Sequence, residues 1–128
     1  MTDLSGTWLG SYWQNSEQVR FEFALIHSGN SLSGNILDDF YLGEANISGV
    51  VLGRKVRFSK QYVFMNQFIV RYSGTVSYDG DSIKGNWFCT EKVLGFHSLD
   101  FGTWEAHRNI DNLNLEWNVI TRLAGIRV

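Results

Sequence analysis

Hydrophobic and polar residues alternate along most of this chain with a period of two. The first such run spans residues 5–14 and places Gly6, Trp8, Gly10 and Tyr12 on one face. A period of two is typical of a β-strand with one buried face, whereas a helix repeats every three to four residues. Helical periodicity is almost absent before residue 109. The pattern therefore predicts an all-β protein.

Alternating runs recur at regular spacing along the chain. After the first, they cover residues 19–27, 32–38, 43–52, 54–63, 67–78, 83–91 and 98–108. The segments 28–31 and 79–82 carry Gly, Asn, Asp and Ser, which is typical of hairpin turns. Eight strands joined by short polar turns predict a β-sandwich or a closed barrel.

The last run breaks the alternation. Leu99 and Phe101 share one parity, whereas Trp104 and Ala106 share the other. One extra residue in a strand reverses its parity, and glycine tolerates the conformation that this requires. We therefore expect a β-bulge at Gly102.

A weak internal repeat links two of the turns to the strands that follow them. Residues 29–36 (GNSLSGNI) match residues 80–87 (GDSIKGNW), with Gly34 and Gly85 at equivalent inward positions. A glycine inside a strand often marks a sharp bend or a close approach of two backbones. We expect both glycines to have this role.

The C-terminal segment, residues 109–128, fits two patterns. Leu113, Leu115, Trp117 and Val119 alternate as in a strand, and a stripe through Leu113, Trp117, Ile120 and Leu123 fits a helix. We expect an additional strand here, with a helix as the alternative. The prediction is one domain over residues 1–128, with a barrel at about 5–108 and a C-terminal extension.

The ordered set of short motifs resembles the calycin superfamily, which includes lipocalins, fatty-acid-binding proteins and avidins. Gly6-x-Trp8 resembles the start of the first calycin strand, and the order of the short strand motifs is most similar to that of avidins. The resemblance implies an eight-stranded antiparallel up-and-down barrel in which a basic residue packs over Trp8. Arg108 is the best match and Arg122 the second. Gly10 stands where avidins place a polar residue for biotin, so biotin binding is not implied.

Composition narrows the classes of protein that remain. The chain has 128 residues, a formal net charge of −2 and a single cysteine, Cys89. The charge argues against a nucleic-acid partner, and one cysteine excludes an intramolecular disulfide. No apolar run approaches the roughly 18 residues of a membrane-spanning helix. The N-terminal residues do not resemble a signal peptide, so we expect a cytoplasmic protein.

Candidate chemistry comes from polar residues on otherwise apolar faces. Lys60 shares a face with Phe58 and Tyr62, while His27 and Asp38 end two other apolar faces. A buried lysine needs a partner for its charge, and the candidate partners are Asp38, Glu44 and Glu105. In the competing interpretation, Lys60 lies at a strand end and its flexible stem carries the ammonium group to solvent. Polar residues are common at strand ends, which favours this interpretation.

The leading functional hypothesis is non-catalytic binding of a small hydrophobic or amphipathic molecule in the barrel mouth. In it, Lys60 attracts an anion or a carbonyl, and Tyr62 and Tyr72 hydrogen-bond the same group. The candidate ligand-binding residues are Tyr12, His27, Asp38, Phe58, Lys60, Tyr62, Tyr72, Trp87 and Glu105.

Two other hypotheses remain open. One is a cyclase or isomerase acting on an apolar substrate inside the barrel, with Lys60, Glu105 or a tyrosine as the proton donor. The other is a filled barrel that acts as an assembly module. The large side chains of outward parity, Trp13, Val50, Ile69, Phe88 and Trp117, predict a homo-oligomer, a dimer or higher.

We expect neither a metal nor a cofactor. The spacing of His27, His97 and His107 fits no zinc-binding pattern, and Cys89 has no second cysteine beside it. The segment with Asp38, Asp39 and Glu44 is typical of a solvated acidic turn.

Overall fold

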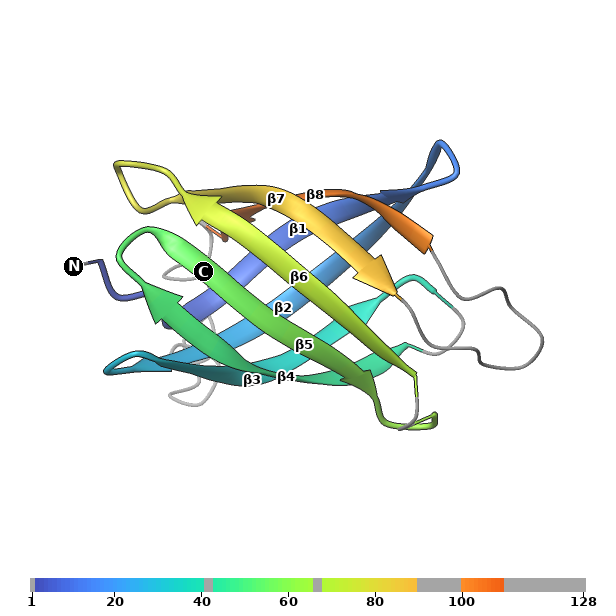
Figure 1. Cartoon of the computed structure of the whole chain (residues 1–128), viewed down its shortest axis with the longest axis horizontal. Helices are drawn as coiled ribbons and strands as arrows, with labels where there is room; N and C mark the ends of the chain where they lie inside the picture. Colours follow the sequence, from blue (N-terminus) through green and yellow to red (C-terminus); the bar gives the residue numbers. More distant parts are fainter. Residues whose placement is uncertain (1, 41–42, 66–67, 90–99, 110–128) are drawn as a thin grey trace, which may run out of the picture.

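A computed structural model describes residues 2–40, 43–65, 68–89 and 100–109, which form eight strands and a closed barrel (Figure 1). The strands are β1 (Gly6–Gln14), β2 (Glu17–Ser28), β3 (Ser31–Asp38), β4 (Glu44–Leu52), β5 (Lys55–Tyr62), β6 (Ile69–Val76), β7 (Ser82–Cys89) and β8 (Asp100–Arg108). Each strand pairs antiparallel with the next, and β8 pairs antiparallel with β1. This confirms the predicted up-and-down barrel.

Alternation of buried and exposed side chains explains why these segments form strands. In β2, Phe21, Phe23 and Leu25 are buried, and the residues between them are exposed. Because all eight described strands place one apolar face inward, the closed sheet encloses a single core and leaves no unpaired edge.

Short turns join the strands where the sequence predicts them. Gly29, with φ of 58°, lies in the two-residue connection of β2 and β3, and Gly80, with φ of 78°, lies between β6 and β7. Asn15 and Ser16 connect β1 and β2 with φ of 50° and 69°. Two consecutive positive φ values are those of a type I′ hairpin, which matches the twist of the flanking strands.

The inward glycines have the predicted role of letting backbones approach closely. A Cβ atom added to Gly34 would lie 1.9 Å from the carbonyl oxygen of Ala24, and one added to Gly85 would lie 1.8 Å from that of Ser73. Gly34 also has φ of 149°, which side chains disfavour. Both glycines therefore stand where neighbouring backbones leave no room for a side chain.

The predicted β-bulge at Gly102 is wrong. Strand β8 pairs without interruption with β7, including Trp87 with Gly102 and Phe88 with Phe101. Gly102, Trp104 and Ala106 share the inward parity, and Phe101 points outward and is 71% exposed. The apparent change of parity came from taking Phe101 as a core residue because it is large and apolar. The other residue of that pair, Leu99, lies outside the described residues, as does the predicted strand or helix at 110–128.

One end of the barrel, here called the closed end, is sealed by Leu4, Trp8 and Arg108. The Arg108 guanidinium lies 4.8 Å from the Trp8 ring centroid, as the resemblance predicted for this residue. Its nitrogens donate to the carbonyl oxygens of Asp3, Ser5 and Gly80. Trp8 donates its indole N–H to the carbonyl oxygen of Leu4 at 2.9 Å.

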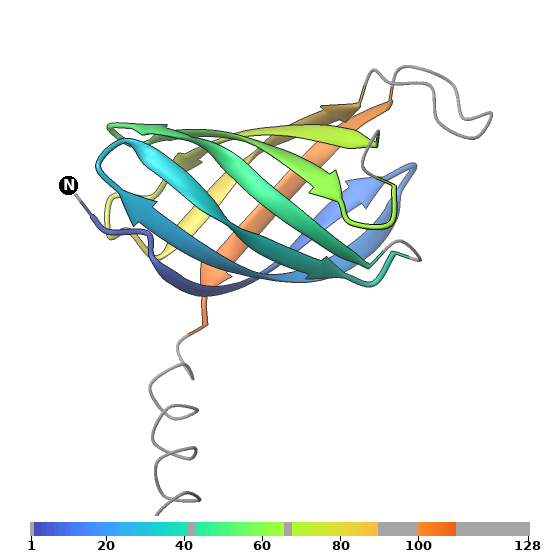
Figure 2. The ribbon, with the colours of Figure 1, turned by 90° about the horizontal axis from the view of Figure 1, so that it is seen from below.

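The chain enters the barrel at the closed end (Figure 2). At the other end, here called the open end, β1, β3, β5 and β7 end and β2, β4, β6 and β8 begin (Figure 1). In the described part of the chain, no helix is long and apolar enough to cross a membrane.

Candidate functional site

A buried ion pair lies inside the barrel near the open end. Lys60 of β5 places its Nζ 3.0 Å from Oδ2 of Asp38, the last residue of β3. The two side chains are 1% and 0% exposed. The interpretation in which Lys60 reaches solvent from a strand end is therefore wrong. Lys60 lies two residues before the end of β5 on the inward parity, so its stem runs into the core.

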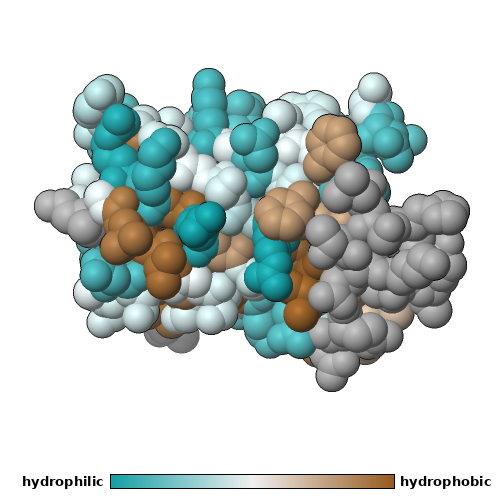
Figure 3. All heavy atoms as spheres, in the orientation of Figure 1, coloured by the Kyte–Doolittle hydropathy of each residue, from teal (hydrophilic) through white to brown (hydrophobic). Residues whose placement is uncertain are grey.

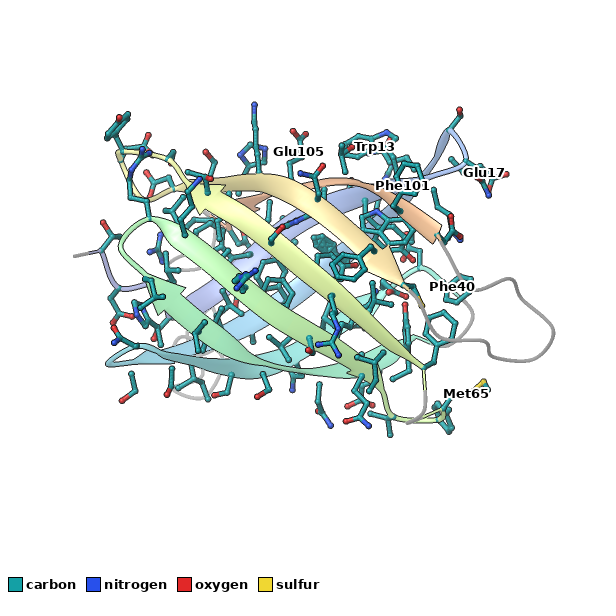
Figure 4. All side chains as sticks on the ribbon, in the orientation of Figure 1. Trp13, Glu17, Phe40, Met65, Phe101 and Glu105 are labelled. Atoms are coloured by element: carbon teal, nitrogen blue, oxygen red, sulfur yellow. The ribbon has the colours of Figure 1, made fainter. Side chains whose placement is uncertain are left out.

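Of the three candidate partners of Lys60, Asp38 is the one that forms the ion pair. Glu44 is exposed at the start of β4. Glu105 points to the outside of β8, between the inward residues Trp104 and Ala106 (Figure 4). Only Asp38 has both the inward parity and a place at the same end of the barrel as Lys60.

The Asp38 carboxylate has a donor for each of its oxygens. Oδ2 accepts a hydrogen bond from the Tyr62 hydroxyl at 2.8 Å as well as from Lys60. Oδ1 accepts the backbone N–H of Phe40 at 3.0 Å, where the chain turns out of β3. These bonds fix the carboxylate beneath the β3–β4 connection and offset the cost of its burial.

Three tyrosine rings surround the ammonium group of Lys60. Its Nζ lies 4.7 Å from the ring centroids of Tyr12 and Tyr62 and 5.3 Å from that of Tyr72. Aromatic faces attract a cation at such distances. Burial raises the pKa of all three phenols well above the ordinary value of 10, with smaller effects from neighbouring charges. The three hydroxyls therefore stay protonated at neutral pH.

A cavity of about 100 Å³ opens from this cluster toward the open end. Most of its wall is aromatic or aliphatic, and Lys60 contributes a buried charge to it. The lining residues are Tyr12, Gln14, Phe40, Lys60, Tyr62, Phe68, Val70, Tyr72, Trp87, Cys89 and Asp100. Asp38 does not line it, because Lys60 and Tyr62 cover the carboxylate. At the rim, Gln14 donates its amide N–H to Asp100 at 2.6 Å.

The predicted site residues fall into three groups. Tyr12, Lys60, Tyr62, Tyr72 and Trp87 line the cavity together, as the parity of their strands implies. Asp38 and Phe58 support it from behind, and the Phe58 ring stacks on that of Tyr72 at 4.9 Å. The remaining two, His27 and Glu105, do not lie at the cavity.

His27 lies at the closed end. Its Nδ1 accepts the backbone N–H of Leu4 at 3.1 Å, and its backbone N–H donates to Ser5 Oγ. This histidine therefore helps to attach the N-terminal segment to the barrel, and it is remote from the cavity. His107 is exposed on β8, and His97 lies outside the described residues.

Sequence reasoning did not select several lining residues. Gln14, Cys89 and Asp100 have inward parity at strand ends, while Phe40, Phe68 and Val70 belong to the rim or the wall. Their position in the order of strands could have identified them. Each lies at the end of an odd-numbered strand, at the start of an even-numbered one or in the connection between them, and all of these meet at the open end.

No group of His, Cys, Asp or Glu within the described ranges could hold a metal ion. Cys89 is buried, and its Sγ lies 3.4 Å from the carbonyl oxygen of Ile69. This is the position of a packed core thiol.

The outer face carries apolar side chains as predicted. Of the predicted residues, Val50 and Phe88 are 44% and 42% exposed. Phe101, which the sequence pattern did not place outside, pairs with Phe88 across β7 and β8 and is 71% exposed. In Figure 3 the hydrophobic side chains on the visible face lie in separate groups among hydrophilic ones. The homo-oligomer stays a prediction, and Trp117 lies outside the described residues.

Comparison with known proteins supports the fold alone. No protein-family model and no curated protein sequence matches the chain. Among solved structures, the chain is similar to a de novo designed fluorescence-activating β-barrel, with a TM-score of 0.55 and 17% sequence identity. The match covers 85% of this chain and 100% of the designed one. The class that fold and site define is a small closed antiparallel barrel with a buried Lys60–Asp38 ion pair inside its open end.

Proposed function

We propose that this protein binds a small hydrophobic or amphipathic molecule in the open end of the barrel without transforming it. The observation that carries the proposal is the cavity of about 100 Å³, with its largely apolar wall and the buried ammonium group of Lys60. Binding sites are commonly apolar hollows with a few placed polar groups. For scale, an apolar cavity of about 150 Å³ can hold benzene, and this cavity also opens at its mouth.

The ion pair itself supports a binding role. A buried salt bridge is a poor source of stability, because well-packed apolar residues of similar volume often stabilise a core equally well. The burial of Lys60 and Asp38 is therefore better explained if the ammonium group orients a bound molecule. The cavity at the open end reaches the buried ammonium group of Lys60, whereas the lining of the hollow at the closed end includes no buried charge.

We also propose that the chain is a distant relative of the calycin superfamily. The contact of Arg108 with Trp8 supports this, together with the barrel topology. The designed barrel of similar fold is described as fluorescence-activating, which is consistent with binding inside a barrel of this kind. The enzymatic alternative and the cytoplasmic location stay predictions.

The proposal can be tested by a ¹H–¹⁵N NMR titration with α-methylstyrene and acetophenone, which are small neutral aromatic molecules. Two indole groups serve as reporters. Trp87 lines the cavity and donates to the carbonyl oxygen of Trp13 at 3.1 Å, whereas Trp8 lies at the closed end. We expect the Trp87 indole signal to shift saturably with at least one of the two compounds and the Trp8 signal to stay in place.

A matched pair of variants provides the control. Val70 lines the cavity, and Val50 lies on the outer face of β4. Val70→Phe should fill the cavity and abolish the saturable shift, while Val50→Phe should leave it unchanged. Absence of saturable binding in the wild type, or equal binding by a folded Val70→Phe variant, would overturn the proposal.

A further inference from the structure

We infer that the cavity selects neutral molecules that carry a carbonyl-type hydrogen-bond acceptor on an apolar, preferably aromatic, body, and that it discriminates against carboxylates. This inference rests on the proposed binding function and specifies its ligand class. It follows from which polar atoms face the cavity, from the charge of the buried pair, and from the rings in the wall.

The polar groups deep in the cavity are hydrogen-bond donors. The ammonium group of Lys60 has three N–H donors, and one is used by Asp38. Tyr12 and Tyr72 also line the cavity with hydroxyls that burial keeps protonated by raising their pKa, and the Tyr12 hydroxyl is already hydrogen-bonded to Tyr62. The Asp38 carboxylate, the strongest nearby acceptor, is turned away toward Tyr62 and the Phe40 backbone. A ligand that reaches this point therefore meets donors and needs an acceptor.

The charge balance favours a neutral acceptor. Lys60 and Asp38 together carry no net charge, so a bound carboxylate would add an unbalanced negative charge close to Asp38. Asp100 at the rim adds a second carboxylate on the entry path. Burying a charge without a counter-charge is costly. A carbonyl oxygen accepts the same hydrogen bonds and leaves the balance unchanged.

The wall favours a flat apolar body for the ligand. The rings of Tyr12 and Trp87 meet edge to face at 5.8 Å, and those of Tyr62 and Phe68 do so at 5.5 Å. These rings line the cavity on different strands and connections. An aromatic ligand can add further stacked or edge contacts to such a wall.

The first experiment compares three ligands of matched shape on the wild-type protein by the same NMR titration. Acetophenone carries a carbonyl, α-methylstyrene replaces that oxygen with a CH₂ group, and benzoate replaces the ketone with a carboxylate. We expect acetophenone to bind about tenfold more tightly than α-methylstyrene, because the hydrocarbon leaves buried donors unpaired. Benzoate should bind more weakly than acetophenone by a similar factor.

The second experiment changes the charge balance. Asp38→Asn removes the counter-charge of Lys60, so benzoate should now bind more tightly than acetophenone and reverse the wild-type order. If that variant does not fold, the double variant Lys60→Met/Asp38→Asn keeps the test available. It removes both charges and the ammonium donors but keeps the tyrosine hydroxyls, so we expect its preference for acetophenone over α-methylstyrene to fall clearly below that of the wild type. An unchanged preference would overturn the role of Lys60.

The outcomes separate this inference from the proposed function. If neither neutral compound shifts the Trp87 signal, the binding function itself fails. If α-methylstyrene binds as tightly as acetophenone, binding stands and the acceptor preference is overturned. If benzoate binds most tightly to the wild type, the cavity is an anion site and the inference is equally overturned.

Discussion

Each end of the barrel has a cation beside aromatic rings, but the two cations have different roles. At the closed end the Arg108 cation lies over the ring of Trp8, and at the open end the Lys60 cation lies among three tyrosine rings. Arg108 donates to main-chain carbonyls of the N-terminal segment and the β6–β7 turn, and its only carboxylate partner in the described residues is the exposed Asp81 at 3.4 Å. Lys60 is satisfied by one side chain, Asp38, and faces a cavity. A cation bound to the backbone seals an end, whereas a cation bound to one carboxylate keeps donors for a ligand.

The largest effect should come from removing the Trp8 side chain. Trp8 is fully buried at the closed end, so Trp8→Ala should lower the free energy of unfolding by about 3–5 kcal/mol. Trp87→Ala should cost clearly less, because one side of Trp87 already borders the cavity. Guanidinium denaturation of the two variants measures both losses. Equal losses would show that the two ends are packed alike.

The second effect concerns the ion pair. Lys60→Met leaves a buried carboxylate without its counter-charge and should cost about 3–5 kcal/mol of stability. Adding Asp38→Asn should restore the stability to within about 1 kcal/mol of the wild type, because no buried charge remains. Chemical denaturation of the single and double variants checks this.

A variant of Arg108 at the closed end provides the comparison for these Lys60 variants. Arg108→Met leaves main-chain carbonyl oxygens without their donor, and these cannot be removed by a second side-chain substitution. No single partner substitution should rescue it. A double variant at the open end that stays as unstable as Lys60→Met would contradict this difference.

The third effect is a loss of stability in alkali that originates at the open end. The pKa of Tyr12, Tyr62 and Tyr72 is raised by burial, so the unfolded chain releases phenol protons near pH 10 while the folded barrel retains them. Stability is therefore complete below pH 10 and falls above it. Each such tyrosine contributes a slope of about 1.4 kcal/mol per pH unit.

Replacing one of these phenols provides the check. Tyr72→Phe should reduce the alkaline slope by the share of one tyrosine, as measured by denaturant titrations between pH 9 and about 11.5. If the slope of the variant equals that of the wild type, Tyr72 does not retain its proton in the folded barrel.

Parity predicted most of the fold, because a residue two positions along a strand must share its face. It placed Lys60 inward beside Phe58 and Tyr62, and it identified the rings around it. It did not identify the counter-charge of Lys60. The pair joins β3 to β5 across the intervening strand β4, so the choice depends on the tilt and register of the closed sheet.

Strand order could have corrected the prediction for His27. In an up-and-down barrel, odd-numbered strands end at one rim and even-numbered strands end at the other. Asp38 ends β3, whereas His27 lies near the end of β2 and so had to be at the opposite rim. Glu105 was misplaced for a different reason. Its neighbours Trp104 and Ala106 share the inward parity with or without a bulge at Gly102, so Glu105 had to point outward.

The pairing of β1 with β8 has a consequence for how the protein is made. Trp8 in β1 leaves the ribosome long before Arg108, which ends β8. Every other strand can pair with its sequence neighbour soon after synthesis, but β1 keeps one open edge until β8 has emerged. Contacts between residues so distant in sequence form slowly. The nascent chain therefore carries an unpaired strand edge from the synthesis of β1 until that of β8, and a chain truncated before β8 would keep that edge permanently.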